Sequence, residues 1–189
     1  MSSSGPLTTQ PTVPIVALVI LIADQITKAI MMANVPLHTR IPVVDGLFAF
    51  THVHNRGMAF GLFNSVGGPW LRWALAGVAI VAVFIIWSYA RHEVARPTVL
   101  IAFGCILGGA IGNLVDRVRY GYVEDFVLAH WNTHEFPAFN VADAAITIGG
   151  IVLFLTLARE PDDPEAEAPP TEISSETRPK AGSRTDAEV

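Results

Sequence analysis

Two aspartates in otherwise apolar surroundings are the strongest candidates for chemistry in this sequence. Asp125 follows an apolar, glycine-rich segment, and Asp143 lies near the start of the last apolar segment. Two carboxylates that share a site do not easily both ionise, so one keeps a proton while the other is anionic. The anionic member can activate water and the protonated member can polarise a carbonyl, which is the chemistry of an aspartic peptidase.

Further polar residues gather in four short strings, at 24–28, 55–61, 112–126 and 140–143. Asp24 and Lys28 are four residues apart, so they share one face of a helix and can form an ion pair. Asn140, Asp143 and Thr147 follow three- and four-residue steps, which places one polar stripe on an apolar helix. We expect that stripe to face the interior of a helix bundle, where a single shared site would account for all four strings.

The elements that must position these residues are predicted to be membrane helices. Hydrophobic residues make up 51% of the 189 and charged residues only 15%, which is too apolar for an ordinary soluble domain of this size. Spanning the hydrocarbon core takes about 20 helical residues. Four windows have that length, at 14–33, 70–90, 97–115 and 139–158. We therefore expect an all-α membrane protein with four transmembrane helices in one peptidase domain over residues 14–158.

The connections between these helices add a small β-layer to the expectation. The region 36–68 contains the turn dipeptide Asp45-Gly46, followed by a β-branched and aromatic run over 47–54, which is typical of short strands. Gly104, Gly108 and Gly112 recur every four residues, so one helix face can admit a neighbouring helix or a ligand. Residues 1–13 form a short N-terminal segment, and the Pro- and Glu-rich residues 159–189 are expected to be a disordered acidic tail.

Charge excludes one class of partner and leaves the orientation open. The net charge of −5 comes from the tail, where nine acidic residues face four basic ones from Arg159 onward, whereas residues 1–158 balance at eight against eight. A neutral body offers no basic surface for nucleic acid. Three basic residues lie near the membrane on the side of the termini and five on the other side. This count alone would place the termini outside, but Arg56 and Arg117 belong to the polar strings, so we discount it.

The four strings together resemble lipoprotein signal peptidase, the signal peptidase II family. The family pattern is approximately D-x-x-T-K, then N-x-G-x-A-F-G, then G-N-x-x-D-R followed by V-x-D-F, and finally N-x-A-D-x-x-I. This chain supplies Asp24, Thr27, Lys28, Asn55, Gly57, Ala59, Phe60, Gly61, Gly112, Asn113, Asp116, Arg117, Val123, Asp125, Phe126, Asn140, Ala142, Asp143 and Ile146. The resemblance covers about residues 14–158.

The resemblance implies roles for these residues. Asp125 and Asp143 would be the catalytic pair, and Asp24, Lys28 and Asp116 would be structural or supporting. The substrate-binding or orienting residues are expected to be Asn55, Gly57, Phe60, Gly108, Asn113, Arg117 and Asn140. Phe60, with Leu62 and Phe63, is expected to contact the lipid of the substrate, and the Gly108–Gly112 face to let the peptide approach.

The resemblance also implies a partner and a location. The substrate would be a diacylglyceryl-modified prolipoprotein, cut just before its lipidated cysteine without a metal or other cofactor. The enzyme would lie in the bacterial inner membrane with both termini in the cytoplasm and an extracytoplasmic β-layer, so that the active site opens toward the outer face. Membrane lipid is therefore the other expected partner. The oligomeric state does not follow from the sequence.

Three other interpretations remain. Asp116 could serve as a catalytic carboxylate, although the adjacent Arg117 favours an ionised, structural salt bridge. His52 and His54 would share one face of a strand, and His130 and His134 have helical spacing, so a metal site is conceivable. The HWNTH string lacks the glutamate that zinc peptidases use as a base. A proton- or ion-coupled carrier would also place charges in membrane helices, but no internal repeat supports it.

Overall fold

The computed structural model describes residues 11–57, 69–90, 96–131 and 134–159. Its four helices are α1 (Thr12–Asn34), α2 (Pro69–Ala90), α3 (Pro97–Arg119) and α4 (Val141–Leu157). Its strands are β1 (Arg40–Val44), β2 (Phe48–Asn55), β3 (Val123–Trp131) and β4 (His134–Glu135). The helices agree with the predicted windows to within a few residues. The N-terminal segment and the acidic tail lie largely outside the described residues.

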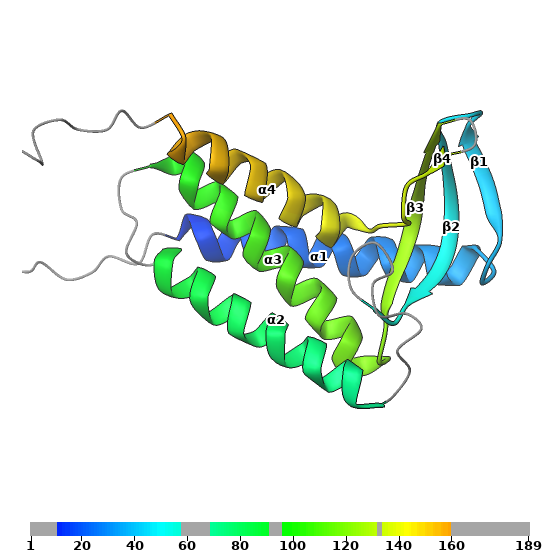
Figure 1. Ribbon diagram of the computed structural model, residues 1–189, viewed down its shortest axis with the longest axis horizontal. Helices are drawn as coiled ribbons and strands as arrows, with labels where there is room; N and C mark the ends of the chain where they lie inside the picture. The colour runs from blue at the N-terminus through cyan, green and yellow to red at the C-terminus, as the bar shows by residue number, and fades with distance from the viewer. Residues whose placement is uncertain (1–10, 58–68, 91–95, 132–133, 160–189) are drawn as a thin grey trace, which may run out of the picture. The chain divides into compact units, whose positions relative to one another are not determined.

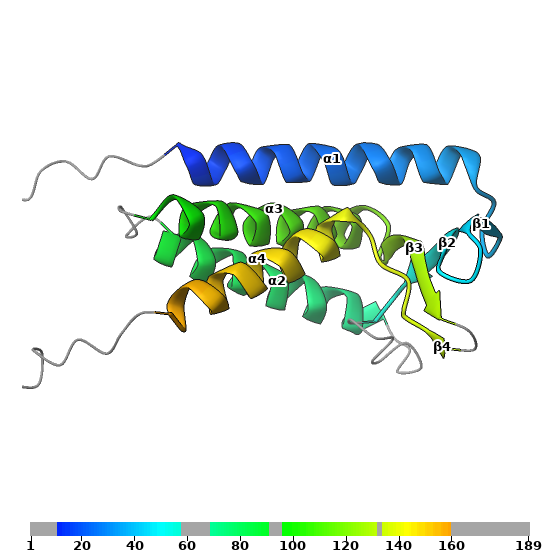
Figure 2. The same ribbon diagram turned by 90° about the horizontal axis from the view of Figure 1, so that it is seen from above.

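Helix α3 is the centre of the bundle and packs against α1, α2 and α4 (Figures 1 and 2). Glycines make this close packing possible. A Cβ on Gly108 would come within 2.5 Å of the carbonyl oxygen of Ala17 in α1, and a Cβ on Gly149 of α4 would come within 2.8 Å of the Ala102 carbonyl oxygen in α3. The four-residue glycine spacing therefore corresponds to helix packing at Gly108.

The helix faces that point away from the bundle are apolar. Ile15, Leu18 and Val19 of α1 and Phe154 of α4 are more than half exposed. By length and composition α1, residues 70–90 of α2, and α3 can each cross a membrane, whereas α4 has 17 residues and is shorter. At about 1.5 Å per residue, α4 extends for roughly 26 Å. Among the described residues, three helices thus meet the length of a span, where the sequence predicted four.

The strands form one antiparallel sheet in the order β1-β2-β3-β4. The β1–β2 hairpin turns at the expected Asp45-Gly46 dipeptide, where Gly46 has φ +77°, a conformation that favours glycine. Strand β2 confirms the strand prediction for 47–54. Strand β3 was not predicted, because strands were expected only within residues 36–68. The sheet therefore combines two connections and is not confined to residues 36–68.

Strand β3 links the sheet to the last helix. Val127 of β3 forms an antiparallel bridge with Phe139. The Val127 N–H donates to the Phe139 carbonyl, and the Phe139 N–H donates to the Val127 carbonyl, both at 2.9 Å. The next residue, Asn140, is the N-cap of α4. The sheet lies at one end of the bundle, and the first turn of α1 and the last turn of α4 lie at the other end (Figures 1 and 2). This connection brings Asp125 of β3 close to the first turn of α4.

Candidate active site

Asn140 joins the two aspartates of the sequence prediction. As the N-cap of α4, its side-chain oxygen accepts the Asp143 N–H at 2.9 Å, which satisfies a free donor of the first turn. That bond determines the orientation of the Asn140 side-chain amide. Its Nδ2 therefore points away from the helix and donates to Oδ1 of Asp125 at 2.7 Å. One buried asparagine therefore holds the start of the helix that carries Asp143 and binds the carboxylate of Asp125.

A second asparagine binds the other aspartate. The side-chain oxygen of Asn113 accepts from Lys28 at 3.1 Å and from Asn140 at 3.2 Å. Because both contacts are donors, the amide nitrogen of Asn113 must face away, and it donates to Oδ1 of Asp143 at 2.8 Å. The orientation of Asn113 thus depends on the buried lysine beside it.

Asn55 completes the set from strand β2. Its side-chain oxygen accepts the Gly57 N–H at 3.0 Å, and its Nδ2 donates to Oδ2 of Asp125 at 2.9 Å. Arg117 reaches the same region, since its Nη2 donates to the Gly57 carbonyl at 3.3 Å. Both oxygens of Asp125 therefore accept an amide N–H, and the arginine lies next to the loop that positions Asn55.

Lys28 lies between two buried carboxylates behind these asparagines. Its Nζ is 2.8 Å from Asp24 Oδ2 and 2.7 Å from Asp116 Oδ2, and all three side chains are buried. Asp24 also accepts the Ala142 N–H of α4 at 3.0 Å, as an anion at a helix N-terminus. The predicted pair of Asp24 and Lys28 is confirmed. The expected partner of Asp116 was wrong, because Asp116 pairs with Lys28 while Arg117 points toward Gly57.

The electrostatics of Asp125 are unusual for an aspartate. Its side chain lies on β3 and the residue is 1% exposed. Burial, followed by the nearby charge of Asp143, raises the pKa of Asp125 to about 7, although the hydrogen bonds from Asn55 and Asn140 act in the opposite direction. A carboxyl with this pKa can keep or release a proton near neutral pH, which suits acid–base chemistry.

A cavity of about 440 Å³ opens beside Asp143, and Asp125 is not among the described residues that line it. Its polar lining comes from Asn55, Asn113, Arg117, Asp143 and Thr147, and most of the rest is apolar, including Phe136, Phe139, Ile146 and Ile148. Thr147 is exposed at this cavity and its hydroxyl donates to the Asp143 carbonyl, so it does not face the bundle interior as predicted. The cavity can accept an apolar chain with a polar group at one side.

Some predicted residues lie elsewhere. Gly108 packs against α1 rather than lining the cavity, and Phe60 lies outside the described residues, as do Leu62 and Phe63. His130 and His134 do not have helical geometry, because they belong to β3 and β4 and line a separate hollow of about 430 Å³ at the sheet. The helical metal site considered for these two histidines is therefore wrong.

Two contributors were missed by the sequence reasoning. Gln25 donates to Asp116 Oδ1 at 2.9 Å and to Asp24 Oδ2 at 3.2 Å. It therefore adds a donor to the lysine cluster, which consists of Lys28, Asp24 and Asp116. The Glu124 carbonyl accepts from Asn140 at 3.2 Å. Both residues lie inside strings that were singled out for their neighbours. Gln25 could have been identified from the sequence, because its carboxamide directly follows Asp24 in a predicted membrane helix, where polar side chains need partners.

Comparisons with known proteins show the family to which the chain belongs. A family model described as signal peptidase (SPase) II matches residues 16–159. A lipoprotein signal peptidase of Nitratidesulfovibrio vulgaris (strain DP4) is 42% identical over 145 residues, which cover 77% of this chain and 88% of that protein. One of Pseudomonas aeruginosa (strain UCBPP-PA14) is 39% identical over 154 residues, covering 80% and 90%. A solved bacterial membrane enzyme is similar with a TM-score of 0.68 and 27% identity, over 80% of this chain and 95% of that one.

Apolar helices around a polar site with two aspartates define a membrane enzyme of the aspartic peptidase class. The extent of the family match then gives a narrower assignment: the chain belongs to the signal peptidase II family.

Proposed function

We propose that this peptidase removes signal peptides from diacylglyceryl-modified bacterial prolipoproteins, with Asp125 and Asp143 as its catalytic pair. The observation that carries the proposal is the way Asn140 binds both residues, by accepting the backbone N–H of Asp143 and donating to the carboxylate of Asp125. The two aspartates come from different elements, β3 and α4, and this one side chain sets their relative position. The names of the similar proteins support the substrate class.

The chemistry follows from one proton held by the pair. The anionic carboxylate takes a proton from water as the water oxygen attacks the scissile carbonyl carbon, while the protonated carboxyl donates a hydrogen bond to the carbonyl oxygen. When the tetrahedral intermediate collapses, the C–N bond breaks and a proton passes to the leaving amine. Asn55, Asn113 and Asn140 donate to the carboxylates and hold them in place, without changing protonation state themselves.

Substrate orientation is assigned to the cavity beside Asp143. Arg117 lines it with the guanidinium directed toward the Gly57 carbonyl, so it can also donate to a carbonyl of the bound peptide. The apolar lining, with Phe136, Phe139 and Ile148, suits the apolar residues of a signal peptide. Cleavage falls just before the lipidated cysteine, whose acyl chains remain in the membrane because each buried CH₂ contributes about 0.8 kcal/mol.

The proposed topology has four spans, with both termini in the cytoplasm and the sheet on the outer side of the inner membrane. The short α4 fits a span because its outward face is apolar at Ile148, Ile151 and Phe154. Basic residues near the sheet do not argue against this orientation, since Arg40 pairs with Glu135 and Arg72 donates to the Val118 carbonyl. These residues serve the fold and are poor indicators of the cytoplasmic side.

The test compares lipidated and unlipidated precursor with purified enzyme in detergent. Wild-type protein should cleave only the lipidated form, and Asp125→Asn and Asp143→Asn should each abolish cleavage. Asp45→Asn, the same change in the exposed hairpin turn, is the matched control and should keep full activity. Activity retained in either site variant, or equal cleavage of both precursors, would contradict the proposal.

A further inference from the structure

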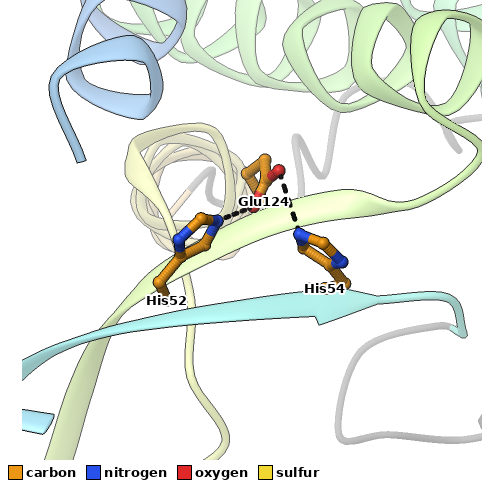
Figure 3. Close-up of side chains that lie close together, drawn as sticks. All are labelled: His52, His54 and Glu124. Carbon is orange, nitrogen blue, oxygen red and sulfur yellow. Dashed lines mark hydrogen bonds and ion pairs between the residues drawn. The ribbon is translucent and has the colours of Figure 1, made fainter. Parts of the chain in front are cut away.

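A second group of titratable side chains lies on the other face of the same two strands. In the ladder between β2 and β3, Val53 pairs with Asp125 and His54 pairs with Glu124. Side chains alternate across a strand, so Asp125 and Glu124 point to opposite faces. Asn55 and Asp125 share one face, and His52, His54 and Glu124 share the other. Figure 3 shows these three side chains converging from the two strands.

The geometry of this group is that of a three-donor set for a cation. The Nε2 atom of His52 lies 2.9 Å from Glu124 Oε2, and the Nε2 atom of His54 lies 3.5 Å from Glu124 Oε1. One donor atom from each residue falls within 4.8 Å of the others. Two imidazoles and a carboxylate are ligands that zinc accepts, usually in a tetrahedral arrangement with room for a further ligand.

The tautomer of His52 strengthens this interpretation. Its Nδ1 lies 2.8 Å from the Val35 carbonyl oxygen, which can only accept, so Nδ1 carries the proton. In the neutral ring, Nε2 then has a lone pair directed at the Glu124 carboxylate, so this 2.9 Å contact needs either an added proton or a metal ion. A backbone carbonyl bound to the other ring nitrogen is also the usual outer contact of a metal-binding histidine.

A proton satisfies only part of the group. It can join His52 to Glu124 at 2.9 Å, whereas the contact of His54 with the same carboxylate, at 3.5 Å, is long for a hydrogen bond. A divalent cation would satisfy all three donors at once. The ring of His54 is held for this by Tyr122, which stacks on it at 3.9 Å between centroids.

We propose that His52, His54 and Glu124 form a binding site for a zinc-class divalent cation, on the face of the sheet opposite the aspartate pair. The ion would fasten β2 to β3 beside the residues that carry Asn55 and Asp125. Its role is structural, because both aspartates face away from it. The inference departs from the sequence expectation of a protein without metal, and it does not depend on the proposed peptidase chemistry.

The test is a metal titration of the full-length protein in detergent after chelator treatment. Co²⁺ should bind with one ion per chain and give the visible absorption of a low-coordinate site, and Zn²⁺ should displace it. His54→Gln should weaken Co²⁺ binding by at least about tenfold, since even outer contacts of metal ligands contribute that much. His134→Gln, an exposed histidine on β4 of the same sheet, is the control and should leave binding unchanged.

A second readout protects the test against misfolding. Zn²⁺ should raise the melting temperature of the wild type and of His134→Gln, but not that of His54→Gln or Glu124→Gln. His54 is only half-buried, so its replacement should retain the fold, which circular dichroism would verify. Equal Co²⁺ affinity in wild type and His54→Gln, or no saturable binding by the wild type, would overturn the proposal.

Discussion

The Nδ2 atom of Asn140 lies 2.7 Å from Oδ1 of Asp125, while the oxygen of the same side chain caps the helix that carries Asp143. A capping residue is ordinarily a matter of stability, typically worth about 1 kcal/mol. Here the same side chain also donates a hydrogen bond to the carboxylate of Asp125. The two roles can be separated by mutation, because they use different atoms of the amide.

Asn140→Ser should separate capping from catalysis. Serine is a good N-cap, so the variant keeps the bond to the Asp143 N–H, but it cannot donate to Asp125 across the same distance. Losing a hydrogen bond to a charged group costs about 1.5–3 kcal/mol, so kcat/KM should fall roughly 10- to 100-fold. Asn140→Ala should lose activity to a similar extent and also unfold at lower temperature. Equal melting temperatures for the two variants would argue against the capping role.

The buried lysine should matter more to stability than either of its partners. Lys28→Met leaves Asp24 and Asp116 buried without a counter-charge, which should cost about 3–5 kcal/mol. Asp24→Asn should cost less, about 1–2 kcal/mol, because Lys28 then keeps one carboxylate and the new amide oxygen can still accept the Ala142 N–H. Thermal unfolding in detergent measures both. A larger loss in Asp24→Asn than in Lys28→Met would contradict this account of the cluster.

The raised pKa of Asp125 should make the protein less stable as the pH rises. The folded state holds the proton up to about pH 7, whereas the unfolded chain releases it near 3.8, so the folded state binds more protons between these values. The free energy of unfolding therefore falls by about 4 kcal/mol as the pH rises through this range. Asp125→Asn should flatten the dependence of melting temperature on pH between about 4 and 7. An unchanged slope in the variant would show that Asp125 titrates normally.

Two adjacent glycines of α4 should respond in opposite ways to alanine. In Gly149→Ala the new methyl group would lie 2.8 Å from the Ala102 carbonyl oxygen, so we expect a loss of about 1–3 kcal/mol. Gly150 has open space around its Cβ position, and Gly150→Ala should be neutral or stabilising by about 0.5–1 kcal/mol. Melting temperatures of the two variants test whether α3 and α4 pack as closely as described. Similar losses in both would contradict it.

The sequence predicted the features that depend on local pattern. The helices follow from apolar length, the pair of Asp24 and Lys28 from their spacing, and the hairpin from Asp45-Gly46. Strand β3 was missed for a physical reason: residues 123–126 are all buried, so the alternation that marks a half-exposed strand is absent. The partner of Asp116 could not be predicted either, because Lys28 comes from a distant helix and the adjacent Arg117 was the more obvious candidate.

The bond from the Ala142 N–H to Asp24 joins positions 118 residues apart in the chain. During synthesis, the first helix exists long before its partner is made, and the lysine cluster alone does not bring the two acid groups together. The aspartate pair can assemble only once the last helix has been translated and docked. On the proposed assignment of the aspartate pair, the chain therefore gains peptidase activity only after its last helix has docked.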